Sequence, residues 1–302
     1  MSSKNSNLLN YSSNKQSKKR KLVLLLGSGI SKSLSPEIHN KAFRELGLDI
    51  EYGLCDVAEN EFESIVGQII KDERVIGFNV TIPFKERIIR YTTELDSVAN
   101  VARAVNLVAI SPNRKKIVGY NTDIDGVIAS LSKLGLLGRS GLRAVILGAG
   151  GAARGCLYAI LANGFDFVLI LNRSKKRADE LGSDFAKRFP AKKIESDVLG
   201  AEELETALQN ADLVINTIPL TADLHFDLSF RNAKSGLRLL DLNYRRNPPV
   251  LHVARKEGIT SIDGSLMLVE QAARSFEILT GISAPRKTML LAAKKEASRQ
   301  KD

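Results

Sequence analysis

One stretch in the middle of the chain constrains the fold more than any other. Its letters, RAVILGAGGAARGCLYAILANG, give an apolar strand pattern, a turn with Gly148, Gly150 and Gly151, and a helix of small residues that stops at Gly164. This order is typical of a βαβ unit in which backbone N–H groups and the helix dipole receive a pyrophosphate. Because Ala153 replaces the third glycine, the flanking strand and helix supply most of the signal. We therefore predict a Rossmann-type dinucleotide-binding domain.

The end of the next strand pattern, FVLILNRSKKR, indicates which dinucleotide is bound. A site for NAD places an acidic residue about 20 positions beyond the glycines, to accept a hydrogen bond from the ribose. Here the position holds Asn172, and four cations follow at an expected helix start: Arg173, Lys175, Lys176 and Arg177. Positive charge is unfavourable at a helix N-terminus unless an anion is bound there. A 2′-phosphate fits this pattern, which favours NADP, and a solvated basic helix start is the alternative.

The first part of the chain also alternates strand and helix patterns. Strand patterns occur at KLVLLLG, at Glu51–Val57 and at VIGFNVTI, and a helix pattern occurs at SPEIHNKAFRELG. In that helix Ser35 suits the N-cap, Pro36 the first turn and Gly47 the stop. A further helix is expected from about Lys85. Such alternation predicts the α/β class, with a largely parallel sheet covered on both faces.

Composition and charge exclude several classes of protein. The chain has 302 residues, 44% hydrophobic and 26% charged, which suits a globular protein of two domains. Of the net charge of +10, six positive charges lie in residues 1–21, and no acidic residue lies there. The remaining +4 shows no interleaving of basic and aromatic residues, so we expect no nucleic-acid partner. Residues 1–20 are predicted to be a disordered basic tail.

The cysteines and apolar runs point to a reducing cytoplasm. Cys55 and Cys156 lie far apart in apolar stretches, and the three histidines are scattered, so we expect neither a disulfide framework nor a metal site. The apolar run LVLLLG is too short for a signal peptide, and no segment approaches the roughly 20 apolar residues of a membrane span. We expect no membrane partner.

Five segments, in order, resemble the shikimate dehydrogenase family, over about Gly27 to Gly281. They are SKSLSPEIHN, NVTIPFKE, AVN with NTD, GAGGAAR with NRSKKR, and GSLMLVEQAARSFEILTG. The resemblance implies a substrate-binding domain of residues 21–124 and 264–302 around an inserted NADP-binding domain of residues 125–263, with the active site in the cleft between them. It also implies reversible oxidation of the small molecule shikimate to 3-dehydroshikimate with NADP, a step in aromatic amino-acid biosynthesis. We expect a monomer or homodimer.

The resemblance also implies roles for individual residues. Lys85 and Asp123 would act at the reacting oxygen. The substrate-binding residues would be Ser33 and Ser35 at the carboxylate, Thr81, Asn106, Asp123 and Gln271 at the ring hydroxyls, and Tyr244 along the pocket. The cofactor-binding residues would be Gly148, Gly150, Gly151, Ala152, Asn172, Arg173, Ser174, Arg177 and Gly264.

The chain departs from the family pattern around Ala-Val-Asn, where Arg103 replaces a usual glycine and Leu107 a usual threonine. A cation at Arg103 would affect which hydroxylated acid binds. An enzyme that prefers quinate or another cyclohexane acid is therefore one alternative. A non-catalytic regulator that senses NADP or a ligand is another, and it predicts loss of the pair Lys85 and Asp123, both of which are present.

Overall fold

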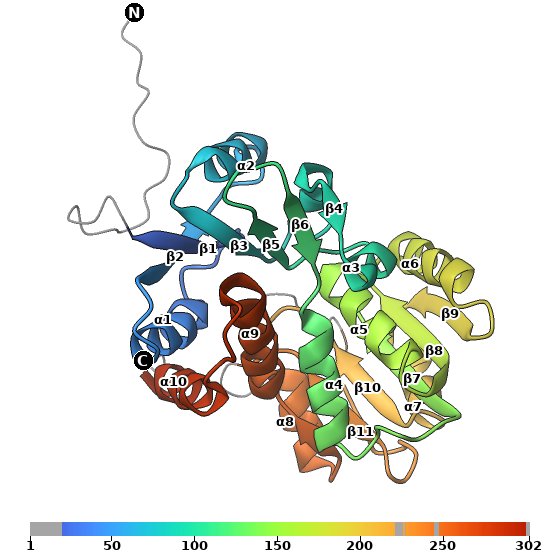
Figure 1. The fold of residues 1–302 in the computed structure, drawn as a ribbon. Helices are drawn as coiled ribbons and strands as arrows, with labels where there is room; N and C mark the ends of the chain where they lie inside the picture. Colours follow the sequence, from blue (N-terminus) through green and yellow to red (C-terminus); the bar gives the residue numbers. More distant parts are fainter. Residues whose placement is uncertain (1–19, 221–225, 227, 245–247, 300–302) are drawn as a thin grey trace, which may run out of the picture. The chain divides into compact units, whose positions relative to one another are not determined.

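The structure is a computed structural model that describes residues 20–220, 226, 228–244 and 248–299 (Figure 1). The tail predicted for residues 1–20 lies outside these ranges except for Arg20, which forms ion pairs with Asp49 (2.8 Å) and Glu51 (3.6 Å). The described chain divides into two compact units. The first unit runs up to Thr122 and includes Ala272–Glu296, and the second unit contains Asp123–Gln271.

The first unit is built on a six-stranded mixed sheet with the order β2-β1-β3-β5-β6-β4. Its strands are β1 (Lys21–Gly27), β2 (Ile50–Asp56), β3 (Val75–Val80), β4 (Glu94–Leu95), β5 (Leu107–Ile110) and β6 (Ile117–Tyr120). Its helices are α1 (Ser35–Glu45), α2 (Phe62–Lys71), the 3₁₀ helix η1 (Arg87–Tyr91), α3 (Ser97–Ala102), the second half of α9 (Ser265–Thr280) and most of α10 (Arg286–Arg299).

The predicted α/β class is confirmed, but the sheet of the first unit is not parallel throughout. Strand β1 pairs in parallel with β2 and β3, whereas β5 is antiparallel to both of its neighbours. The sequence pattern had not indicated the hairpin of β5 and β6. Because each of these strands has only four residues, neither shows enough alternation to be recognised.

Apolar side chains on both faces hold this sheet. On one face α2 packs on β1 and β3, and the rings of Phe62 and Phe84 stack at 4.4 Å. On the other face α1 and α9 meet where Phe43 and Phe276 stack at 5.3 Å. The unbroken apolar run of β1 is thus explained, because a parallel strand covered on both faces is buried on both sides, here from Leu22 to Gly27.

Two predicted helix starts are wrong. The N-cap residue of α1 is Leu34 rather than Ser35, because the hydroxyl of Ser33 accepts the N–H of Ser35 (3.3 Å) from two positions upstream. The helix expected from about Lys85 is the short η1, which begins at Arg87. The carbonyl of Lys85 accepts the N–H of Val105 (2.8 Å), so it is not available for a helical hydrogen bond.

The second unit is the predicted Rossmann-type domain. Within the described residues, neighbouring strands of its sheet are parallel, and the strand order is the doubly wound β12-β11-β10-β7-β8-β9. The strands are β7 (Leu142–Leu147), β8 (Phe165–Asn172), β9 (Lys193–Val198), β10 (Leu213–Asn216), β11 (Arg238–Asp241) and β12 (Thr260–Ile262). The helices are α4 (Asp123–Lys133), α5 (Gly151–Leu161), α6 (Lys175–Arg188), α7 (Ala201–Leu208), α8 (Pro249–Lys256) and the start of α9.

Arg103 stands in a backbone conformation that explains why a glycine suits this position. It is the C-cap of α3, with φ 52° and ψ 36°, and its N–H donates to the carbonyl of Ala99 (2.8 Å). This left-handed region costs a residue with a Cβ roughly 1–2 kcal/mol, whereas glycine adopts it freely. The side chain of Arg103 is exposed. The departure from the family pattern is therefore a local backbone strain.

We expect Arg103→Gly to raise the free energy of unfolding by about 1 kcal/mol, because it relieves the left-handed strain. Urea denaturation followed by circular dichroism measures the change. Arg103→Ala is the control, since it removes the guanidinium but keeps the Cβ. If Arg103→Ala stabilises the protein as much as Arg103→Gly does, the charge and not the backbone conformation is responsible.

Candidate active site

Most of the predicted substrate residues of the first unit gather at one edge of its sheet. Parallel strands β1 and β3 end at the same edge, where the loops with the serine pair and with Lys85 begin. Strand β5 runs antiparallel to β3, so its start, after Asn106, lies at this edge, and so does the end of β6. The topology thus brings together Ser33, Ser35, Thr81, Lys85 and Asn106.

The serine pair opens helix α1. The two hydroxyls lie 3.3 Å apart, and Ser33 is half-buried while Ser35 is buried. In this arrangement Ser33 Oγ donates to Ser35 Oγ. Two neighbouring hydroxyls at a helix start are suited to bind a carboxylate, since they can donate in the direction that the helix dipole favours.

The segment that follows β3 holds Thr81 and Lys85 on a fixed backbone. The N–H of Thr81 donates to Leu26 (2.9 Å), and its carbonyl accepts the N–H of Phe84 (2.9 Å). The peptide bond between Ile82 and Pro83, inside this turn, is cis. Lys85 is half-buried, and its carbonyl is bonded to Val105, the residue before Asn106. The backbone therefore sets Lys85 and Asn106 next to each other in the first unit.

Asn106 is buried and fixes the chain just before Asp123. Its Oδ1 accepts the N–H of Thr122 (2.7 Å), and its Nδ2 donates to the Thr122 hydroxyl (3.0 Å). Asp123 is the next residue and the first of α4 in the second unit, where it is buried. A carboxylate at the first turn of a helix is favoured by the dipole.

In the second unit the glycine turn after β7 leaves no room for a side chain at its first glycine. Gly148 has φ 103°, and a Cβ there would lie 2.5 Å from the hydroxyl of Thr217. That hydroxyl donates to the carbonyl of Leu147 (2.7 Å), which ties the end of β10 to the turn. Gly150 is the extended N-cap of α5, and Gly151 and Ala152 form its first turn. The N–H groups of such a helix start form an anion site, so these residues fit a pyrophosphate.

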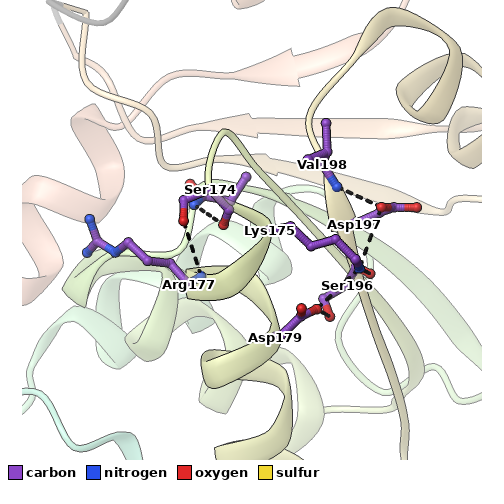
Figure 2. Close-up of polar contacts among 8 residues, drawn as sticks. Ser174, Lys175, Arg177, Asp179, Ser196, Asp197 and Val198 are labelled. Atoms are coloured by element: carbon purple, nitrogen blue, oxygen red, sulfur yellow. Dashed lines mark hydrogen bonds and ion pairs between the residues drawn. The ribbon is translucent and has the colours of Figure 1, made fainter.

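The four cations after β8 have different environments. Lys175 Nζ bonds the carbonyl of Ser196 (3.0 Å) and pairs with Asp179 (3.3 Å) and Asp197 (3.6 Å), so it joins α6 to β9. In Figure 2 the side chain of Arg177 points away from this cluster. Ser174 caps α6 by accepting the N–H of Arg177 (3.4 Å), and the side-chain amide of Asn172 donates to the Ser174 carbonyl (2.9 Å).

The remaining three cations are accessible to a ligand. Arg173, Lys176 and Arg177 are exposed, and none of these three side chains has a hydrogen-bond or ion-pair partner within the described ranges. Since Lys175 is occupied by β9, an anion at the start of α6 would meet the two arginines and Lys176.

Asn243 connects the loops that leave three strands of the second sheet. Its N–H and Nδ2 both donate to Asp241 Oδ1 (2.9 and 2.7 Å), and Nδ2 also donates to the carbonyl of Ile218 (3.0 Å). Its own carbonyl accepts the N–H of Gly264 (3.1 Å). Burial raises the pKa of Asp241, whose Oδ2 has no hydrogen-bond partner within the described ranges. Asn243 thus fixes the backbone on either side of Tyr244 and Gly264.

The last predicted residues lie in this region of the second unit. Tyr244 follows Asn243 and is half-buried. At Gly264 a Cβ would lie 2.1 Å from the carbonyl oxygen of Leu242, so only glycine fits. Gln271 is half-buried on α9, and its Nε2 donates to the carbonyl of Leu268 (2.9 Å).

Sequence reasoning missed several polar residues that hold these sites: Tyr52, Asn79, Thr122, Thr217, Asp241, Asn243 and Ser275. One signal was available, since Asn79 interrupts the apolar strand VIGFNVTI, and a buried amide must be hydrogen-bonded. The hydroxyls of Thr217 and Ser275 gave no such signal, because their partners lie far away in the sequence.

No helix in the described ranges is long and apolar enough to cross a membrane.

Three family models match the chain. They are the shikimate dehydrogenase substrate binding domain over residues 25–108, shikimate / quinate 5-dehydrogenase over residues 131–242, and the shikimate 5′-dehydrogenase C-terminal domain over residues 264–294.

Individual relatives agree with these models. The shikimate dehydrogenase (NADP(+)) of Methanopyrus kandleri is 37% identical over 275 residues, which cover 89% of this chain and 93% of the relative. A crystal structure of a shikimate dehydrogenase in complex with NADP⁺ has a TM-score of 0.80 at 28% identity, over 93% of this chain and 97% of that one. The Thermus thermophilus enzyme in complex with NADP(H) and shikimate has a TM-score of 0.75 at 28% identity, over 91% and 99%. The chain belongs to the shikimate dehydrogenase family.

Proposed function

We propose that this protein oxidises shikimate reversibly to 3-dehydroshikimate with NADP as the cofactor. One observation supports this most strongly: a single sheet edge of the first unit collects a serine pair, Thr81, a half-buried lysine and a buried asparagine. Such a set can bind a carboxylate and several hydroxyls and can exchange a proton. The family of the chain contains enzymes named for this reaction.

The proposed roles follow the chemistry of each side chain. Ser33 and Ser35 bind the carboxylate, and Thr81, Asn106, Asp123 and Gln271 bind the ring hydroxyls. Lys85 and Asp123 remove the proton from the hydroxyl that is oxidised and return it in the reverse direction, because a ketone that gains hydride becomes an alkoxide. A bound NADP⁺ would supply the acceptor for the hydride that leaves the carbon of that hydroxyl.

The cofactor residues fit NADP. The start of α5 at Gly150 to Ala152 presents helix N–H groups to a pyrophosphate, and Arg173 and Arg177 are available for a 2′-phosphate. Tyr244 would line the pocket, and Gly264 would lie near the nicotinamide. We assign residues 21–124 and 264–302 to substrate binding and residues 125–263 to NADP binding. The reaction requires the two ligands to come into contact, because a hydride passes from one to the other.

The two alternatives are less well supported. Preference for quinate was suggested by Arg103, but that side chain is exposed and its position is explained by the C-cap of α3. A non-catalytic regulator does not need Lys85 or Asp123, both of which are present and at least half-buried. We further propose action in a reducing cytoplasm, since both cysteines are buried thiols that form no disulfide. We also propose that the protein is a monomer or homodimer.

We expect the purified protein to reduce NADP⁺ with shikimate, with a higher kcat/KM than with quinate and a higher kcat/KM for NADP⁺ than for NAD⁺. Absorbance at 340 nm follows the reaction. A higher kcat/KM for quinate would support the first alternative. Binding of NADP⁺ without turnover of either acid would contradict the proposed activity.

We expect Arg173→Gln to raise the KM for NADP⁺ about 10- to 100-fold and to change the KM for NAD⁺ little, because a charge-assisted hydrogen bond contributes roughly 1.5–3 kcal/mol. Lys175→Met is the matched control: it removes a cation two residues away that is bonded to β9, so the KM for NADP⁺ should not change. Equal losses for both cofactors in Arg173→Gln, or a large loss in Lys175→Met, would contradict the assignment.

A further inference from the structure

A continuous chain of hydrogen bonds crosses the buried part of the first unit. It passes through five side chains: Tyr52, Asn79, Ser275, Thr122 and Asn106. One end is Tyr52 on β2, and the other end is the proposed hydroxyl ligand Asn106. All five residues are at most 5% exposed. The chain of hydrogen bonds therefore connects part of the proposed substrate site to the interior of the first unit.

Both the oxygen and the nitrogen of the Asn79 side-chain amide, on β3, form hydrogen bonds here. Its Oδ1 accepts the Tyr52 hydroxyl (3.0 Å), and its Nδ2 donates to the carbonyl of Asn106 (3.0 Å) and to the Ser275 hydroxyl (3.0 Å). Burial raises the pKa of Tyr52, and the ring of His39 stacks on it at 4.3 Å. Tyr52 thus stays a neutral donor at physiological pH, and the direction of the bonds on this side is fixed.

Ser275 connects the two halves of this chain of hydrogen bonds. It lies on α9 and is fully buried. Its hydroxyl accepts from Asn79 Nδ2 and bonds the Thr122 hydroxyl (3.0 Å), and these partners lie 196 and 153 positions away in the sequence. A buried hydroxyl without partners costs roughly 1–3 kcal/mol, so Ser275 has a specific role in this apolar helix face.

Thr122 lies between Ser275 and Asn106 and is hydrogen-bonded to both. The Thr122 hydroxyl bonds Ser275 on one side and both Asn106 Nδ2 (3.0 Å) and Oδ1 (3.2 Å) on the other. With Ser275 in place, the Thr122 hydroxyl has a partner on each side, and it supports the Asn106 amide together with the N–H of Thr122, which donates to Asn106 Oδ1 (2.7 Å). Without it, Thr122 loses one partner and Asn79 another.

We propose that Ser275 is a positioning residue for shikimate binding, which acts on Asn106 both through Thr122 and through Asn79. This proposal rests on the proposed function. It predicts that the Ser275 hydroxyl affects the substrate and not the cofactor, because the whole hydrogen-bonded chain lies in the first unit.

The test uses steady-state kinetics of the full chain with Ser275→Ala, which deletes only the hydroxyl. We expect the KM for shikimate to rise roughly 3- to 10-fold, the range of one net hydrogen bond, with the KM for NADP⁺ unchanged. Ser130→Ala is the matched control, since Ser130 is also fully buried but its hydroxyl bonds the carbonyl of Gly126 (2.8 Å). It should lower stability without a change in either KM.

A second variant keeps the test decisive if Ser275→Ala does not fold. Tyr52→Phe removes the hydroxyl at the other side of Asn79 and should also raise the KM for shikimate; combined with Ser275→Ala, its effect should be less than the product of the two. An unchanged KM for shikimate in the folded variants, or a rise equal to that of Ser130→Ala, would overturn the proposal. Lack of shikimate turnover by the unaltered protein would instead contradict the proposed function.

Discussion

The side-chain amide of Asn79 is the interaction on which the first unit depends most. A polar group in the middle of an apolar strand is tolerated only when all its hydrogen bonds are formed, and loss of one partner costs roughly 1–3 kcal/mol. Asn79 satisfies this requirement by bonding Tyr52, Ser275 and the backbone of Asn106. The strand β3, the helix α9 and the loop before β5 are therefore held in one arrangement, which also fixes the start of the Lys85 segment.

In the second unit a different constraint acts where strands end, because the backbone at two glycines lies too close to neighbouring atoms to leave room for a side chain. Gly148 and Gly264 lie where a Cβ would collide with Thr217 and Leu242. Asn243 then links the exit loops of β10, β11 and β12. Lys175 performs a similar task at the edge, between α6 and β9. Rigid loops of this kind are what a nucleotide site requires, because its ligands are mostly backbone N–H groups.

Much of this arrangement was predictable from sequence, because local patterns specify local structure. The glycine turn, the alternation of strands and helices and the order of the site segments were sufficient for the α/β class and for the Rossmann-type unit. The hairpin of β5 and β6 was not predictable, since strands of four residues have little periodicity. The four cations that follow β8 could not be distinguished in the sequence, because only the fold shows that Lys175 forms an ion pair with Asp197. Ser275 was missed because its partners are remote in sequence.

The central claim is that Lys85 takes part in proton exchange at the reacting oxygen. The most direct measurement is kcat for shikimate oxidation by Lys85→Met, together with calorimetric binding of shikimate. Lys71→Met, at the exposed end of α2, is the control. The account predicts that Lys85→Met lowers kcat by ~10²–10⁴-fold with little change in shikimate affinity, while the control behaves like the unaltered protein. A folded Lys85→Met variant with undiminished kcat across the pH range would contradict it.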